Sequence, residues 1–422
     1  MGCIKSCMSQ HDGANIRKAR HYKFLRQVFW LGMTAFGGPQ IHMSLFKRRL
    51  VDKSSFFTLE TLKEVNAFCS VLPGPTSTQT ISVLGWKKGG PGLAFLTLLA
   101  WALPGAITIS IIALSPKFLE LKNFRFIQPM VAAFIIYATI SMLPWIRKSF
   151  TNYSIFVLVG LLGFLFNSPF IFPIALFLSG WAGFLFNKYT LFEMQVIEPQ
   201  KIQWANLILF GLIFLIIGGG GLFLAENSYY PKLAEPFIYF ENTYRIGALS
   251  FGGGNTLAAM SYEQYVLFTK RLTPQEFNTG LGLLQALPGP NFNFMIYLNS
   301  VSIKSEGGSI LYQLLGCLIG FIAVFLPGVL MVFFAYPLWN TIKNNRNIRL
   351  ALDGIFASTV GFVFSTALNI NNTFWHTTTD FTPEKYIGIL IFFTTLALLF
   401  VKRISPPLIV LFVIFTGYLF SN

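Results

Sequence analysis

The chain alternates long apolar runs with short polar loops over most of its 422 residues. The clearest apolar runs cover residues 93–114, 126–143, 153–166, 170–186, 207–225, 310–336, 355–368, 386–401 and 408–420. Several approach the roughly 20 residues that a helix needs to cross a bilayer. None shows the alternation of period two that is typical of a membrane strand. The pattern predicts an all-α polytopic membrane protein.

Two polar interruptions break apolar stretches in the same way. The first is "AFCSVLPGPTSTQ", starting at Ala67, and the second is "LLQALPGPNFNF", starting at Leu283. Proline removes a backbone hydrogen bond from a helix, and unsatisfied backbone groups are costly in lipid. The interruptions therefore predict broken or re-entrant helices that are buried in protein or line a wet cavity.

Three motifs recur in the same order, which indicates an internal duplication. "TAFGGPQIHM" at Thr34 returns as "LSFGGGNTLA" at Leu249, and the Pro-Gly-Pro break returns with the same offset in the numbering. "WALPGAI" at Trp101 returns as "VFLPGVL" at Val324, with a slightly larger offset that indicates a short insertion. The expected organisation is a basic tail over residues 1–23, a first repeat over 24–200, a connector helix over 201–230 and a second repeat over 231–422.

The number of crossings per repeat sets the relative orientation of the two copies. Seven apolar segments separate equivalent positions, including 24–36, 62–86 and an unpaired connector at 207–225. An odd number predicts inverted-topology repeats, as in many secondary transporters. A re-entrant segment at 62–86 would change this parity. With a cytosolic N-terminus, the tail side carries more Lys and Arg, as topology requires, although the loop at 47–63 is an exception.

The residues that follow each Pro-Gly-Pro break are typical of a helix amino end that binds an anion. Proline fits the first position of a helix, and three hydroxyl residues follow Pro75 while two asparagines follow Pro290. A helix amino end presents free N–H groups and about half a positive charge. The predicted binding residues are Gly37, Gly38, His42, Gly74, Pro75, Thr76, Ser77, Thr78, Arg245, Gly253, Gly254, Asn255, Gly289, Pro290, Asn291 and Asn293. The alternative is that the breaks are packing kinks in a transporter of something else.

Ionisable residues inside apolar segments are further candidates, because membrane burial is costly for them. Arg245 either lies on the anion path or pairs with Glu241. His42, Glu263 and Asp353 are candidates for proton coupling; a structural hydrogen bond, a basic partner and a helix cap, respectively, are the alternatives. The sequence shows no metal-binding cluster and no catalytic triad, so neither a metal, nor another cofactor, nor an enzyme is expected.

The strings "FGGPQIH", "LPGPTSTQ", "FGGGN" and "ALPGPNFNF", in this order and spacing, resemble the chromate ion transporter family in its two-domain form. The resemblance spans roughly residues 24–420 and implies an anion transporter with halves of opposite topology, associated with chromate efflux. His42 matches the family pattern, whereas Asn255 stands where the family often has histidine. We expect a secondary transporter of a chromate- or sulfate-like oxyanion; an anion channel of the same architecture is the alternative.

Composition and the amino-terminal sequence narrow the partners and the location. Only 11% of residues are charged, and the net charge of +15 is spread through short loops, so nucleic acid is not expected as a partner. The expected partners are the oxyanion and the lipid bilayer, and a homodimer is left open. "MGCIKS" fits myristoylation of Gly2 and palmitoylation of Cys3, which suggests a plasma or internal membrane of a eukaryotic cell. Asn371 is a candidate glycosylation site on the non-cytosolic side.

Overall fold

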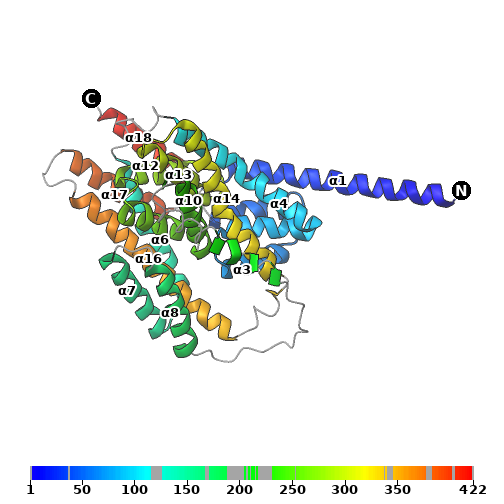
Figure 1. Cartoon of the computed structure of the whole chain (residues 1–422), viewed down its shortest axis with the longest axis horizontal. Coiled ribbons are helices and arrows are strands. Elements are labelled where there is room, and N and C mark those ends of the chain that lie inside the picture. Colours follow the sequence, from blue (N-terminus) through cyan, green and yellow to red (C-terminus); the bar gives the residue numbers. More distant parts are fainter. Residues whose placement is uncertain are drawn as a thin grey trace.

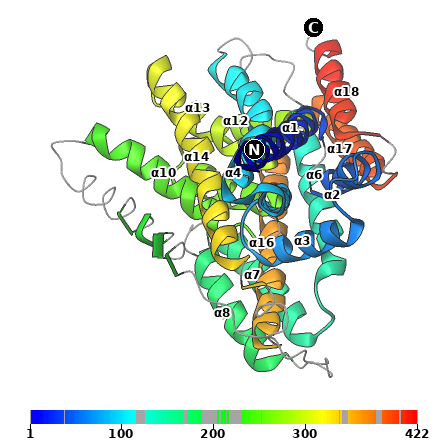
Figure 2. The same cartoon turned by 90° about the vertical axis from the view of Figure 1, so that its right-hand side faces the viewer.

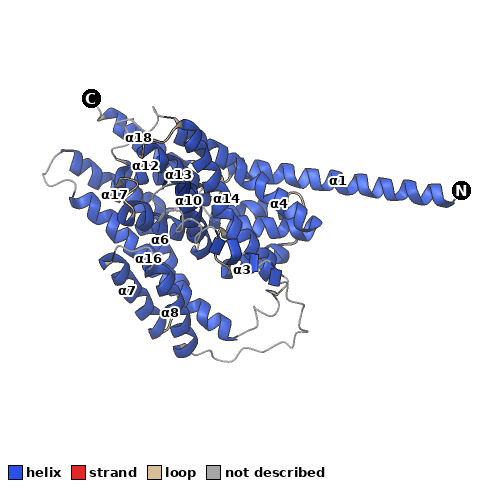
Figure 3. Cartoon of the chain, viewed as in Figure 1, coloured by secondary structure: helices blue, strands red, loops and turns tan. Residues whose placement is uncertain are grey.

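The structure is a computed structural model, which describes residues 2–36, 39–115, 126–166, 171–187, 231–251, 253–336, 338–339, 346–376, 383–401 and 404–420, with a few short pieces between 204 and 216. Within these ranges the chain forms helices and loops and no strand (Figure 3). The all-α prediction is therefore confirmed. In the described ranges, three helical stretches are long and apolar enough to cross a membrane: Thr76–Leu114, Ile310–Ala335 and Arg346–Asn372.

The helices form one body, from which the amino-terminal part of α1 projects (Figure 1). The tail and the first repeat together contain α1 (Gly2–Thr34), α2 (Pro39–Phe46), η1 (Lys47–Asp52), α3 (Leu59–Val71), α4 (Thr76–Leu114), α6 (Ile127–Met142), η3 (Leu143–Trp145), α7 (Phe150–Leu165) and α8 (Ile171–Phe186). The second contains α10 (Pro231–Leu249), α11 (Gly254–Tyr262), η4 (Glu263–Phe268), α12 (Pro274–Ala286), η5 (Asn291–Asn293), α13 (Phe294–Ser305), α14 (Ile310–Ala335), α16 (Arg346–His376), α17 (Pro383–Val401) and α18 (Pro406–Leu419).

Local structure repeats at the same offset in the numbering as the first two sequence motifs. Helices α3 and α12 begin and end at equivalent residues. Both are capped by a threonine side chain, Thr58 in the first repeat and Thr273 in the second. Even the rare positive φ of a residue other than glycine recurs, at Ser55 and Lys270. The duplication therefore extends from sequence motifs to individual turns.

Each repeat starts with a helical hairpin. The tip of this hairpin is the glycine-rich break, which belongs to the motif at Thr34 in the first repeat and to the motif at Leu249 in the second. In the first repeat, η1 and the turn after it run back alongside α1: Ser54 in this turn donates a hydrogen bond of 2.8 Å to Gln27 on α1. The ring centroids of Phe24 and Phe56 lie 5.5 Å apart at the open end of this hairpin, its base. The segment at 24–36 is thus one arm of a hairpin, and counting it as a complete crossing was wrong.

The Pro-Gly-Pro break is the tip of a second hairpin. Near its base, Lys87 on α4 forms an ion pair of 3.2 Å with Glu64 on α3. A straight helix from residue 64 to residue 87 would separate these two residues by about 35 Å. The segment at 62–86 therefore enters and returns on the same side, and the prediction of one crossing is corrected. Because two counted crossings are lost, the count per repeat stays odd; the connector at 207–225 lies largely outside the described residues.

The second helical part of α4 and the whole of α14 run past the hairpins. Gly90, with φ +79°, marks the kink at which α4 turns back towards the tips. Helix α14 is 26 residues long, which corresponds to about 39 Å. Near its start, Tyr312 donates to Glu235 at the base of the second repeat's hairpins. At its other end, Phe333 contacts Trp86 at the base of the first repeat's hairpins, with centroids 4.6 Å apart. The two pairs of hairpins therefore point towards each other from opposite ends of α14, which is the inverted arrangement.

This arrangement also changes the distribution of charged loops. The lysine- and arginine-rich loop at 47–63 lies at the same end as Lys88, whose ammonium group is 4.4 Å from the Phe56 ring centroid. The main exception to the expected charge bias is thereby removed. Lys270 and Arg271, which the predicted topology places on the tail side, lie at the opposite end, since Arg271 pairs with Glu306 at the base of the second repeat's hairpins.

Helices α7 and α8 pack against α16 through glycines (Figures 1 and 2). A methyl group at Gly183 on α8 would lie 2.5 Å from the Leu350 carbonyl oxygen of α16. At Gly163 on α7 it would lie 2.7 Å from the Ser365 hydroxyl. Small residues allow such close helix contacts in membranes, where apolar burial alone gives little drive for association. This bundle supports the four hairpins.

Candidate functional site

The four helix breaks meet at the middle of the molecule through two equivalent hydrogen bonds. The Gly74 N–H donates to the Ser250 carbonyl at 2.9 Å, and the Gly289 N–H donates to the Ala35 carbonyl at 2.8 Å. The two donors occupy equivalent positions of the two repeats, and so do the two acceptors. A pair of contacts that is reciprocal in this way defines a local twofold relation between the repeats. Each Pro-Gly-Pro tip thus binds the glycine-break tip of the other repeat.

The four glycines at the centre are required for different physical reasons. Gly74 and Gly289 have φ of +115° and +96°, a conformation that favours glycine. Gly105 on α4 lies directly against the Pro288 carbonyl, and Gly328 on α14 lies against Pro75. The latter two belong to the "LPG" motif, which indicated duplication but was assigned no role in the site. The recurrence of the motif was the signal that could have identified them.

The helices that begin at the tips have uncapped amino ends. Helix α4 begins after Pro75, α11 after Gly253, and η5, which leads into α13, after Pro290; none of these three residues caps its helix with a side chain. By contrast, threonines cap α3 and α12 at the bases of the hairpins. Uncapped N–H groups are the donors that a bound anion can use.

Polar side chains surround the first-repeat tip. Ser77 Oγ and His42 Nδ1 lie 3.1 Å apart, and both side chains are buried. Trp101 Nε1 donates to Thr78 Oγ1 at 3.2 Å. Gln79 Nε2 donates to the Pro73 carbonyl at 2.8 Å and so supports the turn. His42 Nε2 has no hydrogen-bond partner in the described part of the chain. Three side chains that the sequence predicted are thus together, while Trp101 and Gln79 are additions from the structure.

The second-repeat tip carries amides in the equivalent places. Asn293 Nδ2 donates to the Ala102 carbonyl of the first repeat at 3.1 Å, while Asn293 Oδ1 is buried and has no partner among the described residues. The backbone of Gly254 lies close to the Asn291 side chain. Asn255 is half-buried in the first turn of α11. The two tips therefore share backbone geometry but differ in side-chain chemistry.

The tips are tightly packed. Gly74, Pro75, Ser77 and Thr78 are buried, and Thr76 is half-buried. The cavity beside the first tip, between α4 and α14, has a volume of about 10 Å³. That is about the space of one water molecule. The two pairs of tips are therefore in close contact in this arrangement.

Some predicted residues lie away from the tips. Arg245 donates to Glu241 at 2.7 Å and to Asn242 at 2.8 Å, so it makes the structural pair that was its alternative role. Glu263 is buried at the start of η4, after α11 and thus one helix away from the glycine break of the second repeat. One of its carboxylate oxygens has no partner in the described residues. Asp353 forms an ion pair of 3.1 Å with Arg147. The helix-cap interpretation of Asp353 is wrong, because α16 begins at Arg346, two turns earlier.

The remaining candidates have the following positions. Gly37 and Gly38 lie outside the described residues. Gly2 and Cys3 are at the start of the projecting α1 (Figure 1), and nothing further is described of their surroundings. Asn371 is in α16, where its amide donates to the Ala367 carbonyl at 2.7 Å. Within the described residues, no group of His, Cys, Asp and Glu could hold a metal ion.

Two repeats of broken helices, which meet tip to tip from opposite ends, define a polytopic membrane protein of the inverted-repeat transporter class. The chain belongs to the chromate transporter family: the family model "Chromate transporter" matches residues 22–184 and 237–418. It is 23% identical to the "Uncharacterized transporter MJ0718" of Methanocaldococcus jannaschii, over 92% of both chains. It is also 23% identical to a "Chromate transport protein" of Pseudomonas aeruginosa, over 87% of this chain and 84% of that one. No solved structure matches.

Proposed function

We propose that this chain is a secondary transporter of a small inorganic oxyanion, of the chromate or sulfate type. The ion binds where the amino ends of α4, α11 and η5 converge. The observation that carries the proposal is that three helix amino ends without a side-chain cap are brought to the tips, which meet through the reciprocal bonds Gly74–Ser250 and Gly289–Ala35. Free N–H groups and the helix dipole attract an anion without the burial of a lysine in the membrane.

The polar atoms near the tips support an ion or water at this place. His42 Nε2 and Asn293 Oδ1 are buried and have no partner among the described residues. Buried polar groups without a partner are uncommon, because each costs about 1–3 kcal/mol. The Pseudomonas relative is named for chromate, and sulfate presents the same tetrahedral dianion to the same donors.

Alternating access requires the tips to separate in turn. The two bonds Gly74–Ser250 and Gly289–Ala35 close the centre in the structure, so rocking of one repeat against the other would open it. Among the proton-coupling candidates, His42 has the best position, because it contacts Ser77 in the first turn of α4. Asp353 is less suited, since its carboxylate is engaged by Arg147.

Transport of radiolabelled oxyanions into liposomes tests the proposal. We expect saturable uptake of chromate or sulfate by the purified protein, with a rate that a pH gradient changes. Replacing Thr76, Ser77 and Thr78 together with alanine should raise KM about ten- to a hundredfold, because it removes up to three hydrogen bonds of about 1 kcal/mol each. Unchanged KM in a folded variant would contradict the binding site.

A matched control separates binding from general damage. The hydroxyls of Thr139, Thr366 and Thr416 donate to carbonyls four residues earlier in their own helices, α6, α16 and α18. Replacing these three threonines with alanine removes the same number of hydroxyls from helices that do not form the tips. KM should then stay within about threefold of the wild-type value.

An anion channel of the same fold is the second candidate. A channel would conduct the anion through a continuously open path. The current across a bilayer would then reverse at the equilibrium potential of the permeant anion. The close contact of the two pairs of tips is what a transporter requires between its two open states. Steady anion currents that reverse at that potential, together with uptake that does not saturate, would decide for the channel.

Three further proposals concern the cell biology of the chain. The N-terminus is cytosolic, in a plasma or internal membrane of a eukaryotic cell, and it carries lipid at Gly2 and Cys3. A glycan is attached at Asn371. The chain works as a monomer or a homodimer, which crosslinking in the membrane would distinguish. Gly2→Ala should remove the lipid from the intact mass and change the distribution between membranes; an unchanged mass would refute acylation.

A further inference from the structure

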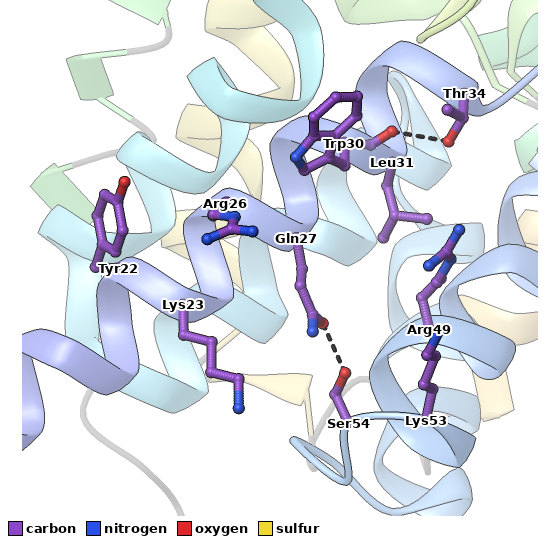
Figure 4. Close-up of a pocket in the computed structure, with 10 residues that line it drawn as sticks. All are labelled: Tyr22, Lys23, Arg26, Gln27, Trp30, Leu31, Thr34, Arg49, Lys53 and Ser54. Atoms are coloured by element: carbon purple, nitrogen blue, oxygen red, sulfur yellow. Dashed lines mark hydrogen bonds between the residues drawn. The ribbon is translucent and has the colours of Figure 1, made fainter.

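A basic groove lies between α1 and η1 and runs along the first hairpin from its base to Thr34, which precedes the tip residue Ala35 (Figure 4). Its volume is about 630 Å³. The lining residues are Tyr22, Lys23, Arg26, Gln27, Trp30, Leu31, Thr34, Arg49, Lys53 and Ser54. Neither the predicted anion site nor the proposed transport cycle uses this groove.

The groove has a cationic end and an apolar end. Lys23 on α1 lies on the side of the helix from which Gln27 reaches Ser54, and Arg26 lies on the next face, between Tyr22 and Trp30 (Figure 4). Arg49 on η1 and Lys53 just after it line the other side of the groove. No carboxylate lines it, and none of the four cations forms an ion pair within the described part of the chain. Four like charges around one space repel each other, so a bound anion would stabilise them.

The apolar end lies deeper along the hairpin, towards its tip. Trp30 and Leu31 line it, one to two turns closer to the break than Arg26. The neighbouring Phe29 and Met33 are each 43% exposed, as expected for a surface that faces lipid. The cations therefore lie near the base of the hairpin, where the membrane surface is expected, and the apolar wall descends into the hydrocarbon.

The second repeat lacks this groove chemistry at the equivalent positions. Arg26 corresponds to Glu241, Trp30 to Arg245 and Arg49 to Gln264. There Arg245 donates to Glu241 at 2.7 Å and to Gln264 at 3.1 Å, so the two arms of the hairpin are joined by polar side chains. The cationic groove is thus a property of the first repeat and not a consequence of the shared backbone.

We propose that this groove binds one anionic phospholipid. The headgroup phosphate lies among Lys23, Arg26, Arg49 and Lys53, and an acyl chain follows Trp30 towards the tip. Basic pockets at the membrane surface attract anionic lipids, by about 1 kcal/mol for each Lys or Arg. A free inorganic anion would use the cations but gain nothing from the apolar wall, whereas an uncharged lipid would gain nothing from the cations.

Native mass spectrometry of the detergent-purified full chain, titrated with lipid, tests this proposal. We expect phosphatidylglycerol to bind at least tenfold more tightly than phosphatidylcholine. Arg26→Gln with Arg49→Gln should weaken phosphatidylglycerol binding about thirtyfold, as two lost cations imply, and leave phosphatidylcholine unchanged. The matched control, Arg48→Gln with Arg346→Gln, removes two exposed arginines that do not line the groove and should change binding by less than about threefold.

The apolar wall has its own measurement. Phosphatidylglycerol with brominated chains should quench the tryptophan fluorescence of the wild-type protein more than that of Trp30→Phe, because bromine quenches at short range. Equal affinity for both lipids, or an equal loss in the control variant, would overturn the proposal. Displacement of phosphatidylglycerol by millimolar inorganic phosphate, without a difference in quenching at Trp30, would also overturn it, since the groove would then be a site for free anions.

Discussion

Gly105 is the residue at which a single methyl group should most directly disturb the centre of the protein. It lies on α4, in contact with the tip of the opposite repeat. A β-carbon built there would collide with the Pro288 carbonyl oxygen and lie 2.8 Å from Asn293 Nδ2. The obstacle is backbone, which cannot rotate away, so the second-repeat tip must shift as a unit. Gly105→Ala therefore tests whether the tips have to be in close contact.

The equivalent change in the other repeat provides an internal control. At Gly328 on α14, an added β-carbon would lie 3.1 Å from Pro75 Cδ and 3.3 Å from Gln79 Nε2. Replacing glycine by alanine inside a helix gains about 1 kcal/mol, while overpacking costs about 1–3 kcal/mol. Gly105→Ala should thus destabilise the protein by up to about 2 kcal/mol. Gly328→Ala, with a displacement of a few tenths of an ångström, should change stability by less than about 1 kcal/mol.

Thermal unfolding and liposome uptake together measure the outcome. Because the Gly289–Ala35 bond and Asn293 both belong to the displaced tip, Gly105→Ala should also raise the KM for oxyanion about tenfold, the factor that 1.4 kcal/mol represents. Gly328→Ala should keep uptake close to the wild type. If Gly105→Ala unfolds at the same temperature as Gly328→Ala and transports equally well, the tip contact has no importance for stability or binding.

Further predictions concern the first-repeat tip and the helix caps. His42→Ala and Ser77→Ala should each reduce uptake, and the double variant should lose less than the sum, since the two side chains contact each other at 3.1 Å; additive losses would show that they act separately. Thr273→Ala should lower the free energy of unfolding by about 1–2 kcal/mol, because Thr273 caps α12 in a complete capping box. Thr58→Ala removes a cap of α3 without the reciprocal glutamate and should cost about 1 kcal/mol or less; the reverse order in thermal unfolding would refute the capping argument.

The repeats and their order were predictable because each depends on short motifs that recur in the sequence. The common offset of two motifs anticipates the equivalent boundaries of α3 and α12, down to their threonine caps. Turn and cap chemistry depends on a few neighbouring residues, so duplicated sequence folds into duplicated turns. The amino ends that follow Pro75 and Pro290 were predictable for the same reason.

The hairpins were harder to predict, because an apolar run does not state whether it crosses or returns. Residues 62–86 are long enough for one span, and only the tertiary pair of Glu64 with Lys87 distinguishes the two paths. The signal in the sequence was weak: an acid near the beginning of the run and two lysines directly after it. The same applies to Asp353, whose partner Arg147 is 206 residues away in the sequence.

The duplication itself explains why the number of crossings per repeat is odd with or without the hairpins. Each repeat has two hairpins, one at the glycine break and one at the Pro-Gly-Pro break, so mistaken crossings occur in pairs and parity is unchanged. The two ends of α14 give the orientation independently, since Tyr312 and Phe333 contact the bases of different repeats. The inverted arrangement therefore does not depend on the connector.

Backbone symmetry and side-chain asymmetry have different consequences for transport. In inverted-repeat transporters, exchanging the conformations of the two repeats converts one open state into the other. In the proposed cycle, the equivalent bonds Gly74–Ser250 and Gly289–Ala35 would give the two tip contacts a similar cost of separation. His42 and Ser77 stand on one side and Asn293 on the other, so a protonated or charged group can stabilise only the state that exposes the first tip. In the proposed transporter, the KM for oxyanion should therefore differ between the two sides of the membrane, and exchanging the tip side chains between the repeats should reverse this difference; equal KM values on both sides would refute the reasoning.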